Sequence, residues 1–469
     1  MGEAVALAEA SVAELTALIR KREISSVQIT EACLARIDVL NATYRPYLTV
    51  FRDQAMQAAR KADADVRKQE DLGLLHGIPV SVKDVFLIRG TPTTLGSTLL
   101  QGYSADDRAD ATCVERLRQA GAIILGKVHV GSGMAANPDN THLDPPRNPW
   151  RSDCTPGGSS SGSAVSVALG MGYASVGTDL GGSIRIPAAF TGVVGLKPTY
   201  GRVSQYGNIY GLCRSLDHVG PLTRTVRDAA LMLEVLAGHD PRDPTSERRP
   251  VPDFLSFLNE GFQNEALRIG WASDGGPLGA EPEVLSRVET GVRLLANAGG
   301  LIEEIGLPPF DGELWSQLVL LEEWELSEAG SSPSTPYLAY IRGRLRDGRR
   351  KLLDQMTSQV ARVRESYGKL FEQFDLLVLP TTPITAKPFK DRKVWWMGRQ
   401  RDFLDLYISN TWVFNVTGHP AISLPCGFGS EGLPVGLQIV ARQFEEGMLL
   451  RAAAMFEQAA GGFPMPQVL

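Results

Sequence analysis

Two Gly-Gly-Ser segments, separated by a run of small residues, constrain this chain more than any other part of it. The first is Pro156-Gly-Gly-Ser-Ser-Ser-Gly162, and the second is Gly177-Thr-Asp-Leu-Gly-Gly-Ser183-Ile-Arg-Ile-Pro187. Glycine lets backbone amides approach a ligand closely, so each turn can present a hydroxyl and several N–H groups to one point. Acyl transfer needs this arrangement, because a nucleophile and oxyanion-binding groups must meet at one carbonyl. A pair of flexible Ser/Gly loops explains the same residues equally well.

The residues around these segments alternate between helix and strand patterns. Small residues from Ser159 to about Gly170 predict a buried helix whose amino-terminal end would direct unpaired N–H groups at the serine cluster. A strand is predicted over 173–176, and Pro187 suits the first turn of the helix that follows. Because helix, strand and loop keep alternating along the chain, we predict an α/β fold.

Hydrophobic periodicity predicts the remaining elements. Ser11 begins a helical stretch with Glu14 three residues later, which is the spacing of a capping box. The segment Trp395-Trp396-Met397 is expected to lie in a polar loop. One interpretation is that its aromatic side chains form a wall of the substrate pocket. Predicted helices cover 11–38, 52–69, 109–120, 223–237, 282–297, most of 313–374 and 446–460, and predicted strands cover 78–83, 122–125, 267–271, 375–380, 420–425 and 435–440.

The composition argues against several classes of protein. The 469 residues carry a net charge of −6, so no global field favours nucleic acid or an anionic membrane, and neither partner is expected. The longest weakly polar run, 163–177, is shorter than a membrane span. The six histidines show no metal-ligand spacing, so no metal is expected. Five scattered cysteines without a Cys-x-x-Cys motif favour a reducing cytoplasm.

Lys83 stands at the end of a predicted strand in which Ile78, Val80 and Val82 alternate. Its side chain is expected on the opposite face of the strand from Ile78, Val80 and Val82. It would lie at the edge of the sheet where sites form in open α/β folds. A lone lysine here is more often a solvated charge or an ion-pair partner of a neighbour such as Asp84. To act as a base at neutral pH, its pKa would have to fall from about 10.4 to near 7, at a desolvation cost of about 4 kcal/mol.

Two other nucleophiles fit less well. Gly158-Ser-Ser-Ser-Gly162 matches the Gly-x-Ser-x-Gly elbow of α/β-hydrolases with Ser160 at its centre, but no strand precedes it as that motif demands. Cys154 precedes a proline-bearing loop and has no histidine near it in sequence. A serine activated by a lysine base remains.

Taken together, these motifs resemble the amidase signature family. The resemblance is carried by Leu75-His-Gly-Ile-Pro-Val-Ser-Val-Lys83-Asp84, Thr155-Pro-Gly-Gly-Ser-Ser-Ser-Gly-Ser-Ala164 and Gly177-Thr-Asp-Leu-Gly-Gly-Ser-Ile-Arg-Ile-Pro-Ala188, followed by Gly195-Leu-Lys-Pro-Thr-Tyr-Gly-Arg-Val203, Ser215-Leu-Asp-His-Val-Gly-Pro221 and Gly418-His-Pro-Ala-Ile-Ser-Leu-Pro425. It covers nearly the whole chain, and the motifs in this order are highly specific.

The resemblance implies roles for Lys83 and for several residues of the two serine segments. Ser183 would be the nucleophile, Ser159 the bridging serine after a cis Gly158-Ser159 peptide, and Lys83 the base. The oxyanion would be held by backbone N–H groups of Leu180, Gly181, Gly182 and Ser183, with Thr178, Asp179 and Arg185 as supporting residues. Gly133, Met134 and Trp412 are expected to contact the substrate.

Three departures from the family pattern lie near the serine segments and the expected pocket. Ser161 stands where glycine is usual, and Leu180 stands where a small or hydroxylated residue is common. Leu180 would make the mouth of the pocket narrower and more apolar. Gly131-Ser-Gly-Met134 replaces the usual acidic and aromatic residues, and a methionine wall suits an apolar substrate.

We therefore expect one large mixed β-sheet sandwiched between helices, forming a single domain over 1–469. Its parts would be an N-terminal helical layer (1–70), a catalytic core (71–237), a substrate-shaping excursion (238–400) and a return to the core (401–469). The first hypothesis is an amidohydrolase for a hydrophobic or aryl amide, with carbamates and esters as further candidates, without a cofactor and with a homodimer as one assembly. The second is the glutamine-hydrolysing A subunit of a tRNA-dependent amidotransferase. A non-catalytic binding protein on the same scaffold is the third.

Overall fold

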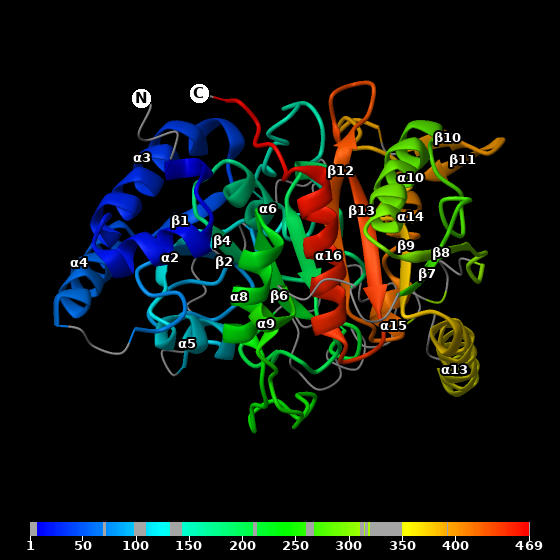
Figure 1. Cartoon of the computed structure of the whole chain (residues 1–469), viewed down its shortest axis with the longest axis horizontal. Helices are drawn as coiled ribbons and strands as arrows, with labels where there is room; N and C mark the ends of the chain where they lie inside the picture. Colours follow the sequence, from blue (N-terminus) through cyan, green and yellow to red (C-terminus); the bar gives the residue numbers. More distant parts are fainter. Residues whose placement is uncertain are drawn as a thin grey trace.

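The computed structural model of the protein describes residues 7–68, 72–97, 109–131, 143–209, 213–258, 267–309, 314, 318, 349–391 and 393–468. The side chains of 349–354 are not among the parts described. Within these ranges the chain forms one large mixed sheet covered by helices (Figure 1). The α/β class and the single large sheet predicted from the sequence are thus confirmed.

The large sheet has 11 strands in the order β1-β3-β2-β4-β6-β5-β12-β13-β9-β7-β8 among the described residues. Pairing is parallel for β3 with β2, β2 with β4, β9 with β7 and β7 with β8, and antiparallel elsewhere. The strands are β1 (Tyr47–Val50), β2 (Pro79–Lys83), β3 (Ile123–Val128), β4 (Ala174–Thr178), β5 (Val194–Lys197), β6 (Val219–Thr223), β7 (Arg268–Trp271), β8 (Leu301–Glu304), β9 (Leu376–Pro380), β12 (Ala421–Phe428) and β13 (Pro434–Ala441). Segment 238–400, predicted as an excursion, therefore contributes three strands.

The N-terminal helices form a layer at one end of the sheet, drawn in blue in Figure 1. They are α2 (Val12–Lys21), α3 (Ser26–Tyr44) and α4 (Arg52–Lys68). The predicted capping box is present, because the Ser11 hydroxyl accepts from the Glu14 amide and the Glu14 carboxylate accepts from the Ser11 amide. The two apolar stripes predicted within 11–38 correspond to α2 and α3; α2 ends at Arg22, which adopts the left-handed conformation, and α3 continues to Tyr44.

The remaining helices cover the sheet. Short helices α6 and α7 pack on each other and against β4, β5 and β12, whereas α16 packs between α8 and α10 and against β12 and β13. The helices are α5 (Thr112–Gln119), α6 (Ser161–Ala168), α7 (Arg185–Thr191), α8 (Val226–Leu236), α9 (Phe254–Phe257), α10 (Pro282–Asn297), α13 (Arg349–Gln373), α14 (Phe403–Ile408), α15 (Val413–Val416) and α16 (Glu446–Ala460). No helix in the described part of the chain is long and apolar enough to cross a membrane.

The prediction of a polar loop at Trp395-Trp396-Met397 is wrong. The two tryptophans lie in β10 (Lys393–Trp396), which pairs with β11 (Arg399–Asp402) in a separate hairpin. Met397 and Gly398 both have positive φ (45° and 78°), which is the backbone geometry that a tight hairpin turn requires. Trp396 is buried and donates its indole N–H to the Leu278 carbonyl, while Trp395 is 72% exposed.

Candidate active site

Lys83 lies at the carboxyl end of β2, whose parallel neighbours are β3 and β4. Its side chain is fully buried, and Nζ donates to Oγ of Ser159 at 2.8 Å and to Oγ1 of Thr178 at 2.7 Å. Burial lowers the pKa of Lys83 to about 7, although the negative charges of Asp217 and Asp179 oppose that change. An amine with this pKa is available as a base near neutral pH.

If Lys83 had only a structural role, Asp84 would be its expected ion-pair partner. Asp84 is instead paired with Lys127. Its carboxylate lies 2.6 Å from Nζ of Lys127 and accepts hydrogen bonds from both the amide and the hydroxyl of Thr94. The Lys127–Asp84 pair thus fixes the loop after β2. Lys83 is left with two neutral hydroxyl partners, which is the arrangement expected of a general base rather than of a structural ion pair.

Ser159 lies in the loop before α6, and the peptide bond between Gly158 and Ser159 is cis. Ser159 is partly exposed, so its hydroxyl can contact both the buried lysine and a substrate. The next residue ties this loop to the second serine segment, because the Ser160 amide donates to the Ser183 carbonyl at 3.1 Å. The two Gly-Gly-Ser segments therefore lie side by side.

Ser183 lies between β4 and α7 and is partly exposed. Of the backbone groups predicted to hold the oxyanion, the Gly182 amide is already used, since it donates to Oδ1 of Asp179 at 2.8 Å. The amides of Gly181 and Ser183 have no acceptor among the described residues. The amides of Gly181 and Ser183 are therefore the better candidates for holding a developing negative charge. Gly182 instead provides the positive φ of the turn, 127°.

Asp179 and Arg185 hold the second segment in shape. The Asp179 carboxylate also accepts from the Ile184 amide, and it pairs with Arg185 in two fully buried contacts of 2.8 and 3.0 Å. Burial alone would raise the pKa of Asp179, but the charge and hydrogen bonds of Arg185 outweigh it and hold the pKa well below its usual range. The pair therefore stays ionised and orders the turn that carries Ser183.

Residues from the C-terminal third complete this support. Arg185 donates to Oε1 of Gln438 at 2.8 Å and to Oδ1 of Asn415 at 2.7 Å, and the Thr411 hydroxyl donates to the Gly181 carbonyl at 2.6 Å. Sequence reasoning missed these three residues. The only signal was a buried polar side chain within apolar strands or short helices, and that signal names no partner.

The predicted substrate contacts are placed only in part. Gly133 and Met134 lie outside the described residues. Trp412 is 2% exposed and packs in an apolar cluster with Phe414 and Leu216, against which the partly exposed Leu180 also packs. Trp412 and Leu180 thus belong to the same apolar cluster, and contact of Trp412 with substrate stays a prediction.

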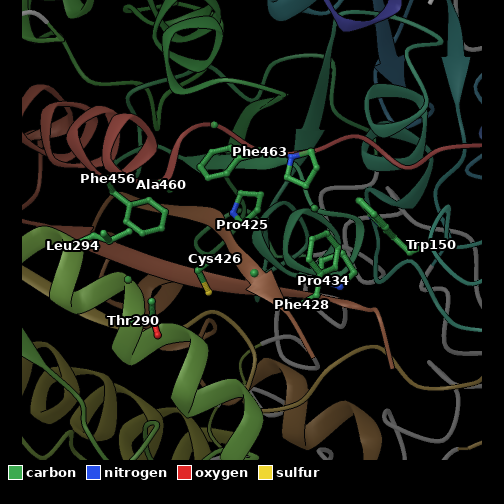
Figure 2. Close-up of a pocket in the computed structure, with 15 residues that line it drawn as sticks. Trp150, Thr290, Leu294, Pro425, Cys426, Phe428, Pro434, Phe456, Ala460 and Phe463 are labelled. Carbon is green, nitrogen blue, oxygen red and sulfur yellow. The ribbon is translucent and has the colours of Figure 1, made fainter. Parts of the chain in front are cut away.

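A cavity of about 290 Å³ lies apart from these residues, between α10, α16, β12 and the C-terminal tail. Figure 2 shows its apolar lining, which includes Trp150, Phe428, Phe456 and Phe463. None of the predicted catalytic side chains lines it. No cluster of potential metal ligands occurs in the described ranges.

The fold and the site together define an amidase. The profile of the Amidase family matches residues 28–450, and the chain belongs to this family of enzymes acting on amide C–N bonds. One relative is the A subunit of the glutamyl-tRNA(Gln) amidotransferase from Anaeromyxobacter sp. (strain K). It is 38% identical over 97% of this chain and 96% of that protein.

Solved structures agree with this assignment. A bacterial aryl acylamidase of the amidase signature family superimposes with a TM-score of 0.85 at 28% identity, covering 96% of each chain. The A subunit of the glutamyl-tRNA(Gln) amidotransferase from Thermotoga maritima gives a TM-score of 0.78 at 29% identity, covering 99% of this chain and 98% of that one.

These relatives overturn one expectation. Net charge predicted no nucleic-acid partner, yet the relatives at 36–38% identity are subunits of an enzyme named for a charged tRNA. The physical reason is that the charge of one chain reports only on nucleic acid that this chain itself binds. One subunit can belong to a tRNA-dependent assembly while another supplies the basic surface.

Proposed function

We propose that this chain hydrolyses a carboxamide through an acyl-enzyme on Ser183. Neutral Lys83 takes a proton from Ser159, which takes one from Ser183, and Oγ of Ser183 then attacks the amide carbonyl. The Gly181 and Ser183 amides stabilise the oxyanion, and the relay returns a proton to the leaving nitrogen as the C–N bond breaks. Water, activated by the same relay, then releases the acid. The observation that carries this mechanism is the buried Lys83 nitrogen 2.8 Å from Oγ of Ser159.

For the substrate, we propose the side-chain amide of glutamine. The support is the identity, over nearly the whole length, with the A subunits of glutamyl-tRNA(Gln) amidotransferases. In this role the chain would release ammonia for a partner protein that holds the charged tRNA. Its five free cysteines would suit the reducing cytoplasm.

One structural observation favours a second candidate, an amidase for hydrophobic or aryl acyl groups, with carbamates and esters as related substrates. Leu180 is partly exposed beside the oxyanion amides and continues into the apolar cluster of Trp412 and Phe414. An aliphatic side chain at this point offers no hydrogen bond to the charged head of an amino acid, whereas it would pack against an apolar acyl chain. The structural likeness to an aryl acylamidase agrees with this candidate.

A product assay separates the two. Purified protein is incubated with glutamine or with an acyl anilide, and the products are identified by mass, with Ser183→Ala as blank. Glutamate released by the wild type alone supports the first candidate, and aniline release without glutamate supports the second. Absence of both, together with failure of a fluorophosphonate to label Ser183, would refute the proposed mechanism.

A further inference from the structure

Asp217 is a buried carboxylate that the mechanism above does not use. It lies in the turn before β6, where its neighbour His218 exchanges backbone hydrogen bonds with Asp179 at the end of β4. Its carboxylate accepts from the Asn208 side chain at 2.9 Å and from the His218 amide at 3.0 Å. Both donors are neutral, and no ion pair to Asp217 occurs among the described residues.

Backbone contacts bring the segment that carries Asp217 close to the segment that carries Lys83. Asn208 forms a bridge with Phe86, three residues after Lys83, and the Ile209 amide donates to the Val85 carbonyl. On the other side, Thr178 pairs with Val219 across β4 and β6, and its hydroxyl accepts from Nζ of Lys83. Asp217 is thus held between the segment that follows Lys83 and the strand that carries the hydroxyl partner of the lysine.

The other charges near Lys83 are already neutralised. Asp179, the residue after β4, also acts on Lys83 through its charge, but it is bound to Arg185. His218 is kept uncharged, because burial and the nearby Lys197 lower its pKa well below the usual value. Asp84, which directly follows Lys83 in the sequence, is paired with Lys127. Among the described residues, Asp217 is therefore a carboxylate without an ion-pair partner, and Lys83 is the cation that acts on it.

We propose that Asp217 is a positioning residue that sets the pH at which Lys83 becomes a base. The inference rests on the proposed function, since it concerns the same relay. An uncompensated negative charge favours the ammonium form of Lys83, whereas burial favours the neutral amine. The two effects leave the lysine basic enough to draw a proton from Ser159 yet neutral near physiological pH. The electrostatics agree, because Lys83 and Asp217 are each the largest charge acting on the pKa of the other.

The test follows the rate of Ser183 labelling by a fluorophosphonate against pH, which needs no knowledge of the natural substrate. Asp217→Asn removes the charge and keeps the size. The acidic midpoint of the profile should move down by about one to three pH units, as expected when a nearby opposite charge is lost. The plateau rate should fall because the base is weaker. A purely structural role for Asp217 would lower the rate and leave the midpoint in place.

Two further variants sharpen the result. Asp228→Asn is the matched control, because Asp228 is also buried but accepts a hydrogen bond from the Ala13 amide in the N-terminal layer. The midpoint of the labelling profile of this variant should equal that of the wild type. The double variant Asp217→Asn with Asn208→Asp moves the charge across one hydrogen bond and should return the midpoint toward the wild-type value.

The wild type alone keeps the inference falsifiable if Asp217→Asn does not fold. Because protonation of Asp217 removes the negative charge that favours the ammonium form of Lys83, the two coupled groups should make the wild-type profile fall more gradually with decreasing pH than one ionisation allows. A single-ionisation slope, or an unshifted midpoint in folded Asp217→Asn, would overturn this inference and leave the proposed function standing. No labelling of wild-type Ser183 at any pH would instead overturn the proposed function.

Discussion

The side chain of Ser160 hydrogen-bonds both backbone polar groups of Thr178. Its hydroxyl donates to the Thr178 carbonyl at 3.0 Å and accepts from the Thr178 amide at 3.2 Å. Ser160 therefore joins the loop before α6 to the end of β4, while its neighbour Ser159 contacts Lys83. Two consecutive serines thus have different tasks, one structural and one proposed to be catalytic.

This division predicts different outcomes for two alanine variants. Ser159→Ala should reduce the rate of amide cleavage by about 10²–10⁴-fold with little change in stability, because a proton-transfer group is lost. Ser160→Ala should lower the free energy of unfolding by about 1–3 kcal/mol, because it leaves buried backbone groups of Thr178 unpaired. Steady-state kinetics and urea denaturation of both proteins check this, and equal kinetic losses would argue against the relay.

Activity should fall on the acid side of neutrality. With a pKa of about 7, Lys83 is neutral above that pH and becomes an ammonium below it, so kcat/KM should rise through pH 7. Lys83→Ala should abolish amide cleavage at every pH while keeping the circular dichroism spectrum of the wild type. Turnover close to wild type in this variant would contradict the assignment of the base.

Gly182 should not tolerate alanine. Its φ is +127°, and an added Cβ would lie 2.4 Å from both Cδ1 of Ile186 and Oγ1 of Thr411. Gly182→Ala should therefore distort the turn that carries Ser183 and reduce fluorophosphonate labelling by about 100-fold or more, the scale of losing an oxyanion donor. Gly461→Ala is the control, since Gly461 also has positive φ (77°) but open space around it. Its labelling rate should be that of the wild type.

Breaking the buried Asp179–Arg185 pair should destabilise the fold. Arg185→Met leaves an uncompensated buried carboxylate and should cost about 3–5 kcal/mol at pH 7. The folded-state pKa of Asp179 is lowered, so its stabilising contribution is present above the pKa of an unfolded aspartate, about 3.9, and declines as pH falls below it. The difference between variant and wild type, measured by urea denaturation, should therefore be smaller at pH 3 than at pH 7.

Leu180→Thr tests the apolar mouth of the site. If Leu180 packs against an apolar acyl group, threonine should lower kcat/KM for an acyl anilide by about 10-fold, the scale for losing methylene contacts in a pocket. Activity toward glutamine should be unchanged or higher. The ratio of the two kcat/KM values is the measurement, and a uniform loss on both substrates would indicate a structural effect alone.

The local part of this structure could be predicted from the sequence, and the long-range part could not. Alternating apolar residues place Lys83 at the end of β2, and the glycine turns place Ser159 and Ser183 in adjoining loops. The sequence predicts that helix α6 begins at Ser159, but it begins at Ser161, because Ser160 has the non-helical φ and ψ of −84° and 42°. The Ser160 hydroxyl bonds to Thr178 and does not cap the helix.

Support for the site comes from residues whose positions in sequence give no hint of their partners. Arg185 and Gln438 are 253 residues apart, and Asn415 reaches Asp179 across 236. The fold brings them together, because α7, which begins at Arg185, packs against β5, β12 and β13. The proposed role of Asp217 could not be predicted from the sequence either. It depends on the pairing of Asp84 with Lys127 and of Asp179 with Arg185.

The Arg185 contacts to Asn415 and Gln438 also bear on how the enzyme matures during synthesis. A nascent chain that has emerged from the ribosome only as far as β6 already contains Lys83, Ser159 and Ser183. It still lacks Asn415 and Gln438, whose side-chain amides accept hydrogen bonds from Arg185 near the proposed nucleophile. It also lacks β13, the strand that carries Gln438. Since domains generally fold as units, the active centre should become competent only after β13 has been synthesised. A polypeptide that ends before β13 would then be unable to cleave amides in the cell.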